Sequence, residues 1–299
     1  MKYGYVGLGN LGQNLAMSLV REGFEVTVTD LDKKNAEKLI AAGAKWADSA
    51  VDLAKAVDCV ITCLPSPKIT AKVLDQILPT MGKGKTWIEM STLGRAEIQN
   101  FAAKCAAHGV ETLACPVTGG VHLAAQGKIT VLVGGPKPLF EKHRKALEAM
   151  GGQIFHMGEL GSEAIIKVIT NMLAFIHLVA CGEALMLAKR GGLDLAQAFH
   201  AIKASSGTSF VHETEGQLIL NGSYDIAFTM DLALKDLNFA MDFGKEFGVP
   251  LALASQTLQQ FIMGAEKYGR DEQSTAIVKL LEDALKTDLR APGFPKRLE

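Results

Sequence analysis

The sequence predicts an α/β protein in which a doubly wound parallel sheet is followed by an all-α domain. Strand and helix patterns alternate from residue 3 to about 156, which is typical of a parallel sheet with helices on both faces. After residue 160 the strand patterns stop, and a proline-free helical pattern over 162–189 opens a run of helices. We therefore expect one domain over residues 1–160, a second over 161–299, and a long helix that joins them.

The first half carries short apolar runs that we interpret as strands. They are rich in β-branched and aromatic residues, and prolines or glycines bound several of them. Helical patterns lie between the runs, for instance at 96–108 and 138–150. The predicted strands are residues 4–6, 25–29, 57–64, 86–90, 110–114, 129–133 and 153–155.

The second half is predicted to be entirely helical. Glycines and one Gly-Val-Pro turn separate the helical patterns. Residues 290–299 contain two prolines and mixed charge, which predicts a loose tail. After the long helix, the predicted helices are residues 195–204, 231–247, 251–268 and 275–285.

Composition excludes several classes of protein. The formal net charge is −1 and no basic run occurs, so nucleic-acid binding is not expected. We find no apolar stretch of the roughly 18 residues that a membrane helix needs, and no signal-peptide pattern at the N-terminus. The five cysteines form no C-x-x-C pair, which predicts reduced thiols in a cytoplasmic protein. The histidines show no ligand spacing, so no metal site is expected.

A glycine-rich segment near the N-terminus carries the most specific motif. Gly7, Gly9 and Gly12 form the pattern G-x-G-x-x-G between a predicted strand and a predicted helix. The first glycine permits a tight turn, the second lets the backbone approach a pyrophosphate, and the third lets the helix pack closely. An ordinary glycine-rich turn is the alternative. The context favours a Rossmann-type dinucleotide site formed by Gly7, Leu8, Gly9, Asn10, Leu11 and Gly12.

Asp30 stands at the end of the second predicted strand, eighteen residues after Gly12. A carboxylate at this place accepts hydrogen bonds from the ribose diol of NAD and repels the 2′-phosphate of NADP. Lys33 and Lys34 lie slightly further on. The alternative is a solvated loop aspartate, and we favour NAD over NADP as the cofactor.

Thr118, Gly119 and Gly120 follow another predicted strand and precede an alanine-rich helical segment. Successive N–H groups there would form an anion-binding nest, to which the Thr118 hydroxyl adds a donor. A substrate carboxylate suits such a site. A purely structural turn is an equally good interpretation of this segment taken alone.

Lys167 and Asn171 are four residues apart in the long helical pattern, so they share one helix face. The apolar surroundings would desolvate Lys167 and favour its neutral form. Such a lysine suits proton exchange with a carbonyl or hydroxyl oxygen during hydride transfer. A lysine that extends from a core helix to water is the alternative. Lys235 and Asp236, taken alone, read as a solvated charge pair.

Four segments together resemble the β-hydroxyacid dehydrogenase family, which includes 3-hydroxyisobutyrate dehydrogenases and tartronate semialdehyde reductases. These segments are residues 4–12, 116–120, 158–171 and 235–237. They occur in the family's order and spacing, and they span nearly the whole chain. The resemblance implies an NAD-dependent dehydrogenase of a small 3-hydroxy acid such as 3-hydroxyisobutyrate, assembled as a homodimer or homotetramer through its helical domain.

The resemblance also assigns roles to individual residues. Lys167 would be the catalytic acid/base, Asn171 its partner at the substrate, and 118–120 the site for the substrate carboxylate. Lys235 would reach the cofactor from the helical domain, with Phe228 nearby. The nicotinamide half of the cofactor would be lined by Leu64, Pro65 and Thr92.

This chain departs from the family's motif Asp-Ala-Pro-Val-Ser-Gly-Gly. The aspartate is replaced by Ala114, the serine by Thr118, and a glycine common soon afterwards by Leu123. The reaction type is therefore predicted more firmly than the substrate. A semialdehyde reductase of the tartronate or succinate type and an imine reductase are alternatives, and Lys167 disfavours the latter. A non-catalytic binding module is the remaining one.

Overall fold

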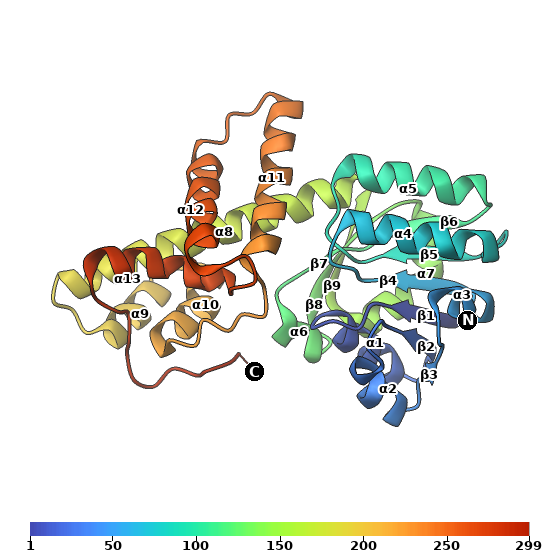
Figure 1. Ribbon diagram of the computed structural model, residues 1–299, viewed down its shortest axis with the longest axis horizontal. Coiled ribbons are helices and arrows are strands. Elements are labelled where there is room, and N and C mark those ends of the chain that lie inside the picture. Colours follow the sequence, from blue (N-terminus) through green and yellow to red (C-terminus); the bar gives the residue numbers. More distant parts are fainter. Residues whose placement is uncertain (299) are drawn as a thin grey trace. The chain divides into compact units, whose positions relative to one another are not determined.

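The computed structural model describes residues 1–298, which form two compact units. The first comprises residues 1–167 and the second begins at Val168, so the boundary lies inside the long helix α8 (Ser162–Arg190). The first unit is a Rossmann-type α/β sheet and the second is helical (Figure 1). The predicted fold class is confirmed.

The sheet of the first unit has nine strands within residues 1–298, in the order β3-β2-β1-β4-β5-β6-β8-β7, with β9 paired to β8. The strands from β3 to β6 in this order are parallel, whereas β8 runs antiparallel to both β6 and β7. All of the predicted strands are present. Their bounds are β1 (Lys2–Val6), β2 (Glu25–Thr29), β3 (Lys45–Trp46), β4 (Cys59–Thr62), β5 (Thr86–Glu89), β6 (Glu111–Ala114), β7 (Val117–Thr118), β8 (Ile129–Gly134) and β9 (Gly151–Gly158).

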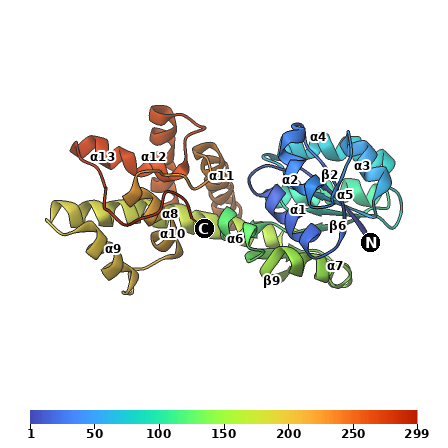
Figure 2. The same cartoon turned by 90° about the horizontal axis from the view of Figure 1, so that it is seen from below.

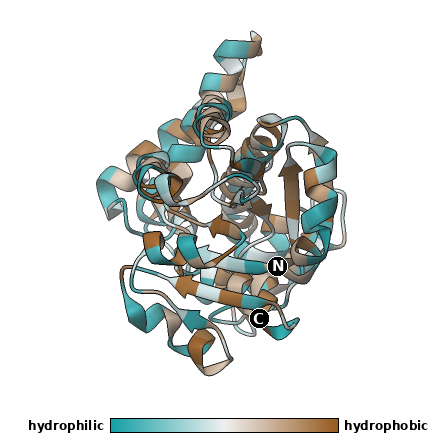
Figure 3. Ribbon diagram, turned by 90° about the vertical axis from the view of Figure 1, so that its right-hand side faces the viewer, coloured by the Kyte–Doolittle hydropathy of each residue, from teal (hydrophilic) through white to brown (hydrophobic). Residues whose placement is uncertain are grey.

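Helices cover both faces of this sheet. Leu15 and Phe140 belong to the buried core on one face, and Leu53 and Ile98 to the core on the other. Figure 3 shows brown, hydrophobic stretches in several strands between these cores, next to white and teal ones. One face carries α1 (Gly12–Arg21) and α7 (Lys137–Met150); the other carries α3 (Ala50–Ala56), α4 (Pro67–Ile77) and α5 (Arg95–Ala107); the shorter elements are α2 (Glu37–Ala41), α6 (Val121–Ala125) and the 3-10 turns η1 (Lys33–Ala36) and η2 (Leu78–Thr80).

The helical unit packs around α8 and a helix hairpin. α11 and α12 lie side by side in Figures 1 and 2 and are joined by the turn at 248–250. Phe175 and Leu185 of α8 and Phe261 of α12 are buried in the core of this unit. Beyond α8 the elements are α9 (Leu195–Lys203), α10 (Phe210–Asn221), α11 (Met230–Phe247), α12 (Ala252–Tyr268), η3 (Ser274–Val278) and α13 (Lys279–Leu285).

Three sequence-based predictions about the fold are wrong. The sheet is not entirely parallel, because β8 returns antiparallel after the two-residue strand β7. The helix α10 was not expected. The segment after residue 290 is not a loose tail up to Arg297: the Phe294 ring packs 4.9 Å from that of Phe199, and Arg297 pairs with Asp225 at 2.8 Å.

The helix α8 also differs from expectation. It is long and apolar enough, by length and composition only, to cross a membrane, with a mean hydropathy of 2.0 over its most apolar 18-residue window. A third of that window is buried within the protein. The sequence contains no uninterrupted apolar run of this length, and we therefore expected no such helix. A helix with few charged residues among many apolar ones also meets the length and hydropathy condition. Buried residues of α8 form the core of the helical unit, as those of a core helix do.

Candidate active site

The sheet register aligns five strand ends. Val6 pairs with Thr29 on one side and Thr62 on the other, Thr62 pairs with Glu89, and Glu89 pairs with Ala114. The loops that follow these residues therefore leave the same edge of the sheet, where ligands of doubly wound sheets bind. Apart from Lys167, the sequence-predicted residues of the first unit lie on these loops, at the start of α1 (Gly12), or at and directly after the end of β7 (residues 118–120).

In the glycine loop after β1, two glycines lie so close to backbone carbonyl groups that a side chain would not fit. Gly7 has φ +95°, and a Cβ there would lie 2.3 Å from the Cys63 carbonyl oxygen. A Cβ on Gly12 would lie 2.1 Å from the carbonyl oxygen of Gly7, whereas Gly9 faces open space. Within residues 1–298 no acceptor meets the N–H groups of Asn10 and Leu11. Open space beside unpaired donors at the start of α1 fits the pyrophosphate of a dinucleotide.

Asp30 follows β2 and faces this loop. Its Oδ2 accepts a 2.6 Å hydrogen bond from the N–H of Leu8, and its Oδ1 accepts from the N–H of Asp32 and from Asn35 Nδ2. These hydrogen bonds hold the half-buried Asp30 carboxylate beside the glycine loop. Leu31 is fully exposed, and the Lys33 ammonium lies 5.3 Å from the centre of the Trp46 ring.

Leu64 and Pro65 follow β4, and Thr92 follows β5, on the next two loops of the same edge. The N–H of Leu64 donates a 2.7 Å hydrogen bond to Ser91 Oγ, which ties the two loops together. The Leu64 side chain lies 3.0 Å from the place of a Cβ on Gly7. The structure thus brings Leu64 beside the glycine loop, and Thr92 directly follows Ser91, the residue that is hydrogen-bonded to Leu64.

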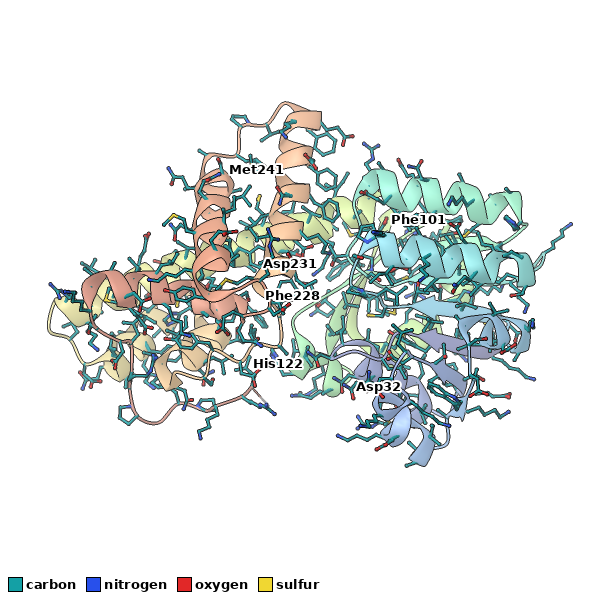
Figure 4. All side chains as sticks on the ribbon, in the orientation of Figure 1. Asp32, Phe101, His122, Phe228, Asp231 and Met241 are labelled. Atoms are coloured by element: carbon teal, nitrogen blue, oxygen red, sulfur yellow. The ribbon has the colours of Figure 1, made fainter. Side chains whose placement is uncertain are left out.

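Thr118, Gly119 and Gly120 form the end of β7 and the start of the short helix α6. Gly119 has φ +123° and Gly120 has φ +92°, conformations that residues with a Cβ rarely adopt. The His122 ring covers Gly120, since a Cβ there would lie 3.1 Å from it. His122, labelled in Figure 4, is half-buried, and this burial lowers the pKa of its imidazole.

Lys167 lies in the second turn of α8 and is 7% exposed. Asn171 follows it one turn later on the same helix and has an unusual partner. The Asn171 amide donates a 2.6 Å hydrogen bond to Oδ2 of Asp236, a buried residue of α11. This bond fixes the rotamer of Asn171, one turn after Lys167.

Asp236 also holds Lys235. The Lys235 ammonium lies 3.0 Å from Asp236 Oδ1. One buried carboxylate therefore pairs with the Lys235 ammonium and accepts a hydrogen bond from the Asn171 amide. The Phe228 ring packs 5.9 Å from that of Phe175, one turn beyond Asn171 on α8 (Figure 4). The helical unit therefore gathers Asn171, Lys235 and Phe228 around α8. Sequence analysis missed Asp236, because its partner Asn171 lies 65 positions away and leaves no local pattern.

Known proteins share the fold and much of the sequence of this chain. Two family models match in succession: the NAD binding domain of 6-phosphogluconate dehydrogenase over residues 2–158, and a segment described as NAD-binding of NADP-dependent 3-hydroxyisobutyrate dehydrogenase over residues 161–281. The chain is 32% identical to 2-(hydroxymethyl)glutarate dehydrogenase of Eubacterium barkeri, covering 94% of this chain and 95% of that relative. It is 31% identical to L-threonate dehydrogenase of Escherichia coli K12, covering 93% of each.

A solved structure of similar fold extends the comparison. The 3-hydroxyisobutyrate dehydrogenase from Salmonella typhimurium matches with a TM-score of 0.88 and 30% identity, covering 94% of this chain and 99% of that one. The fold and these relatives define an NAD(P)-binding oxidoreductase that acts on a CH–OH group. Within that class, the chain belongs to the β-hydroxyacid dehydrogenase family, whose members act on small hydroxy acids.

Proposed function

We propose that this protein is an NAD-dependent dehydrogenase of a small 3-hydroxy acid resembling 3-hydroxyisobutyrate, or works in reverse as a reductase of the matching semialdehyde. The observation that carries the proposal is the buried Lys167 one turn from Asn171, whose amide is held by Asp236. A buried lysine with fixed neighbours is suited to exchange a proton with one oxygen atom. An imine reductase has no need of such a lysine.

The residues divide the work as follows. Bound nicotinamide supplies the acceptor, or in reverse the donor, of a hydride at the carbinol carbon. Lys167 takes the proton of the substrate hydroxyl in oxidation and returns it to the carbonyl oxygen in reduction. Asn171 orients the substrate beside Lys167. The N–H groups at 118–120 and the Thr118 hydroxyl bind the substrate carboxylate.

The remaining residues bind the cofactor. Asp30 accepts hydrogen bonds from the ribose diol, and its charge disfavours NADP. Its carboxylate keeps acceptor capacity for the diol, since Oδ2 receives a single hydrogen bond from the protein. Lys235 and Phe228, which belong to the helical unit, bind the cofactor as well. The other cofactor-binding residues are Gly7, Leu8, Gly9, Asn10, Leu11, Gly12, Leu64, Pro65 and Thr92.

A substrate panel tests this proposal. Purified protein is assayed with NAD and with NADP against 3-hydroxyisobutyrate, glycerate, L-threonate, serine and 4-hydroxybutyrate, following the absorbance of the reduced cofactor. We expect the highest kcat/KM with NAD and a 3-hydroxy acid. A preference for NADP would refute the role of Asp30. Turnover of none of these acids, nor of their semialdehydes, would refute the proposed substrate class.

We also propose that the protein is a homodimer or homotetramer. Three apolar residues of α8 remain exposed: Ile169 by 38%, Leu173 by 42% and Leu187 by 76%. A second copy of the chain would cover such a stripe. Sedimentation equilibrium gives the mass in solution. A monomer at micromolar concentration would contradict this part of the proposal.

A further inference from the structure

The first turn of α8 contains a buried acid that the roles above do not use. Glu163 is 1% exposed and precedes Lys167 by one helical turn. Its carboxyl group fills a space left by two small residues. Gly134 of β8 is one, since a Cβ there would lie 1.6 Å from Glu163 Oε2. Ala114 of β6 is the cross-strand partner of Gly134.

The carboxyl group anchors the start of α8. Oε2 accepts a 2.8 Å hydrogen bond from the N–H of Gly161, and the N–H groups of Glu163 and Ala164 also favour its charged form. These are donors that the first turn of a helix leaves without partners in the helix itself. Oε1 of Glu163 has no hydrogen-bond partner among the residues that the structure describes, 1–298.

A small cavity adjoins the carboxyl group. Its volume is about 10 Å³. Ser91 and Leu93 of the loop after β5 line the cavity. Between them in the sequence stands Thr92, which is predicted to lie at the nicotinamide half of the cofactor site. The cavity is lined by Glu89, Ser91, Leu93, Ile98, Ala114, Pro116, Glu163 and Ala164. Glu163 is thus seated at the strand ends that carry the site.

Burial raises the pKa of Glu163 to about 7, and the backbone N–H donors oppose this shift. The ionisable groups around it come from each packed element: Glu89 of β5, Cys115 after β6, and Arg95, whose side chain lies against Gly161. His156 of β9 donates to the carbonyl of Gly135, next to Gly134, and Lys167 follows one turn along. Because the pKa lies near 7, the group changes charge around neutral pH.

Glu163 lies close to Ala114, the residue that replaces the aspartate of the family's motif. The family's motif carries an aspartate where this chain has Ala114. Ala114 and Glu163 line the same cavity, so a carboxyl group reaches this space from the helix instead of from the strand. An aspartate at position 114 would be attached to β6, whereas the carboxyl group of Glu163 is attached to the helix that bears Lys167.

We propose that Glu163 is a positioning residue: its carboxylate ties the first turn of α8 to the ends of β6 and β8, which sets where Lys167 lies, and the tie weakens when the carboxylate takes up a proton. Hydrogen bonds to a charged acceptor are roughly twice as strong as neutral ones, and the N-terminus of a helix favours an anion. The proposal rests on the proposed role of Lys167.

The kinetic test compares Glu163→Gln with the wild type and with Glu159→Gln, a change at an exposed acid nearby. Turnover number is measured from about pH 5.5 to about pH 9. We expect the kcat of E163Q to be roughly tenfold below that of the wild type at about pH 9, with the two values converging below about pH 6 and NADH binding unchanged. E159Q should follow the wild type. A kcat–pH profile of E163Q that superimposes on that of the wild type overturns the proposal.

A rescue separates positioning from a general packing defect. The double change Ala114→Asp with Glu163→Ala returns a carboxyl group to the cavity from β6. We expect it to recover at least half of the kcat that E163A alone loses. If the kcat of the double variant is no higher than that of E163A, a carboxyl group at position 114 cannot replace the one at position 163, and this part of the proposal is overturned.

A readout independent of turnover keeps the inference separable from the proposed function. The ¹³C resonance of the Glu163 carboxyl group, identified by its absence in E163Q, should titrate near pH 7. Hydrogen exchange at the N–H of Gly161 should be faster in E163Q than in E159Q. If no acid is oxidised but both results hold, only the proposed function fails. Unchanged exchange overturns the anchor itself.

Discussion

The glycine loop of the first unit and the Asp236 cluster of the second unit are built in opposite ways. The loop depends on missing side chains: Gly7 and Gly12 leave room for backbone at 2.3 and 2.1 Å from the place of a Cβ. The cluster depends on side chains that meet across the fold, where Asp236 holds both Asn171 and Lys235. A backbone-built site needs glycine at fixed spacing, whereas a side-chain-built site needs a partner at any distance along the chain.

This difference predicts how each region fails. An added methyl group should damage the loop through packing, because nothing there depends on a side-chain charge. A change of charge at constant volume should damage the cluster. Glu163, in the first turn of α8, combines both features, since its buried carboxyl group accepts a hydrogen bond from the backbone N–H of Gly161 and fills the space beside Gly134.

The largest effect is expected at Lys167. Lys167→Ala should lower kcat by about 10²-fold or more, because general acid–base catalysis contributes that much. NADH binding, followed by cofactor fluorescence, should change little. The matched control is Lys189→Ala on the same helix, where the ammonium pairs with Asp288 at 2.9 Å near the surface. Full turnover by the Lys167 variant would exclude this lysine as the acid/base.

The second effect concerns stability and pH. The pKa of Glu163 rises from its ordinary 4.5 to about 7 in the folded protein, so the folded state binds this proton more tightly. The resulting stabilisation is complete below about pH 4.5 and is lost as pH rises through about 7. The free energy of unfolding of the wild type minus that of Glu163→Gln should fall by about 3 kcal/mol over this range. Urea titrations at each pH measure it, and a constant difference would contradict the shift.

Two glycine variants separate packing from ligand approach. Gly12→Ala should lower the free energy of unfolding by about 1–3 kcal/mol, since its methyl group meets backbone that cannot turn aside. Gly9→Ala should leave thermal unfolding unchanged, because its Cβ enters open space, yet weaken dinucleotide binding. Calorimetric unfolding and NADH titration measure the two properties. An equal loss of stability in both variants would show that the loop is not built as described.

The smallest effect is expected at Asp236. Asp236→Asn keeps the volume and a hydrogen bond to Asn171 but removes the charge opposite Lys235. We expect a loss of about 1 kcal/mol in stability, because Lys235 retains some contact with water, and a few-fold rise in the KM for the cofactor. The control is Asp231→Asn, where an exposed carboxylate pairs with Arg270 at 2.6 Å. Equal effects of the two changes would remove the distinction between the buried and exposed acids.

The two regions also differ in how far the sequence predicted them. The strands, their ends and the glycine loop were predictable because apolar runs and glycine spacing are local signals. The strand β7 has two residues and no periodicity to detect. The helix α10 was missed because its pattern lacks a clear apolar face. Gly216 gives it close contact with the Phe199 ring, 3.3 Å from the place of a Cβ, which is a tertiary feature.

Within the site, the same limit applies. Asp236 was part of a recognised segment, but its partner Asn171 became visible only when α8 and α11 were placed together. Glu163 gave no signal at all, since an acid in the first turn of a helix is ordinarily a solvated residue. Its burial follows from Gly134 and Ala114, which lie on strands far from it in the chain.

The contact between Gly134 and Glu163 restricts the order in which substitutions at these two positions can accumulate. Any side chain at this position occupies the place of the Glu163 carboxyl group, so Gly134→Ala is damaging while Glu163 is present and tolerable once position 163 is small. The two positions are therefore epistatic: the order in which substitutions arise decides which of them survive. A library that varies residue 134 alone would report an immutable glycine, and one that varies both positions would show the dependence between them.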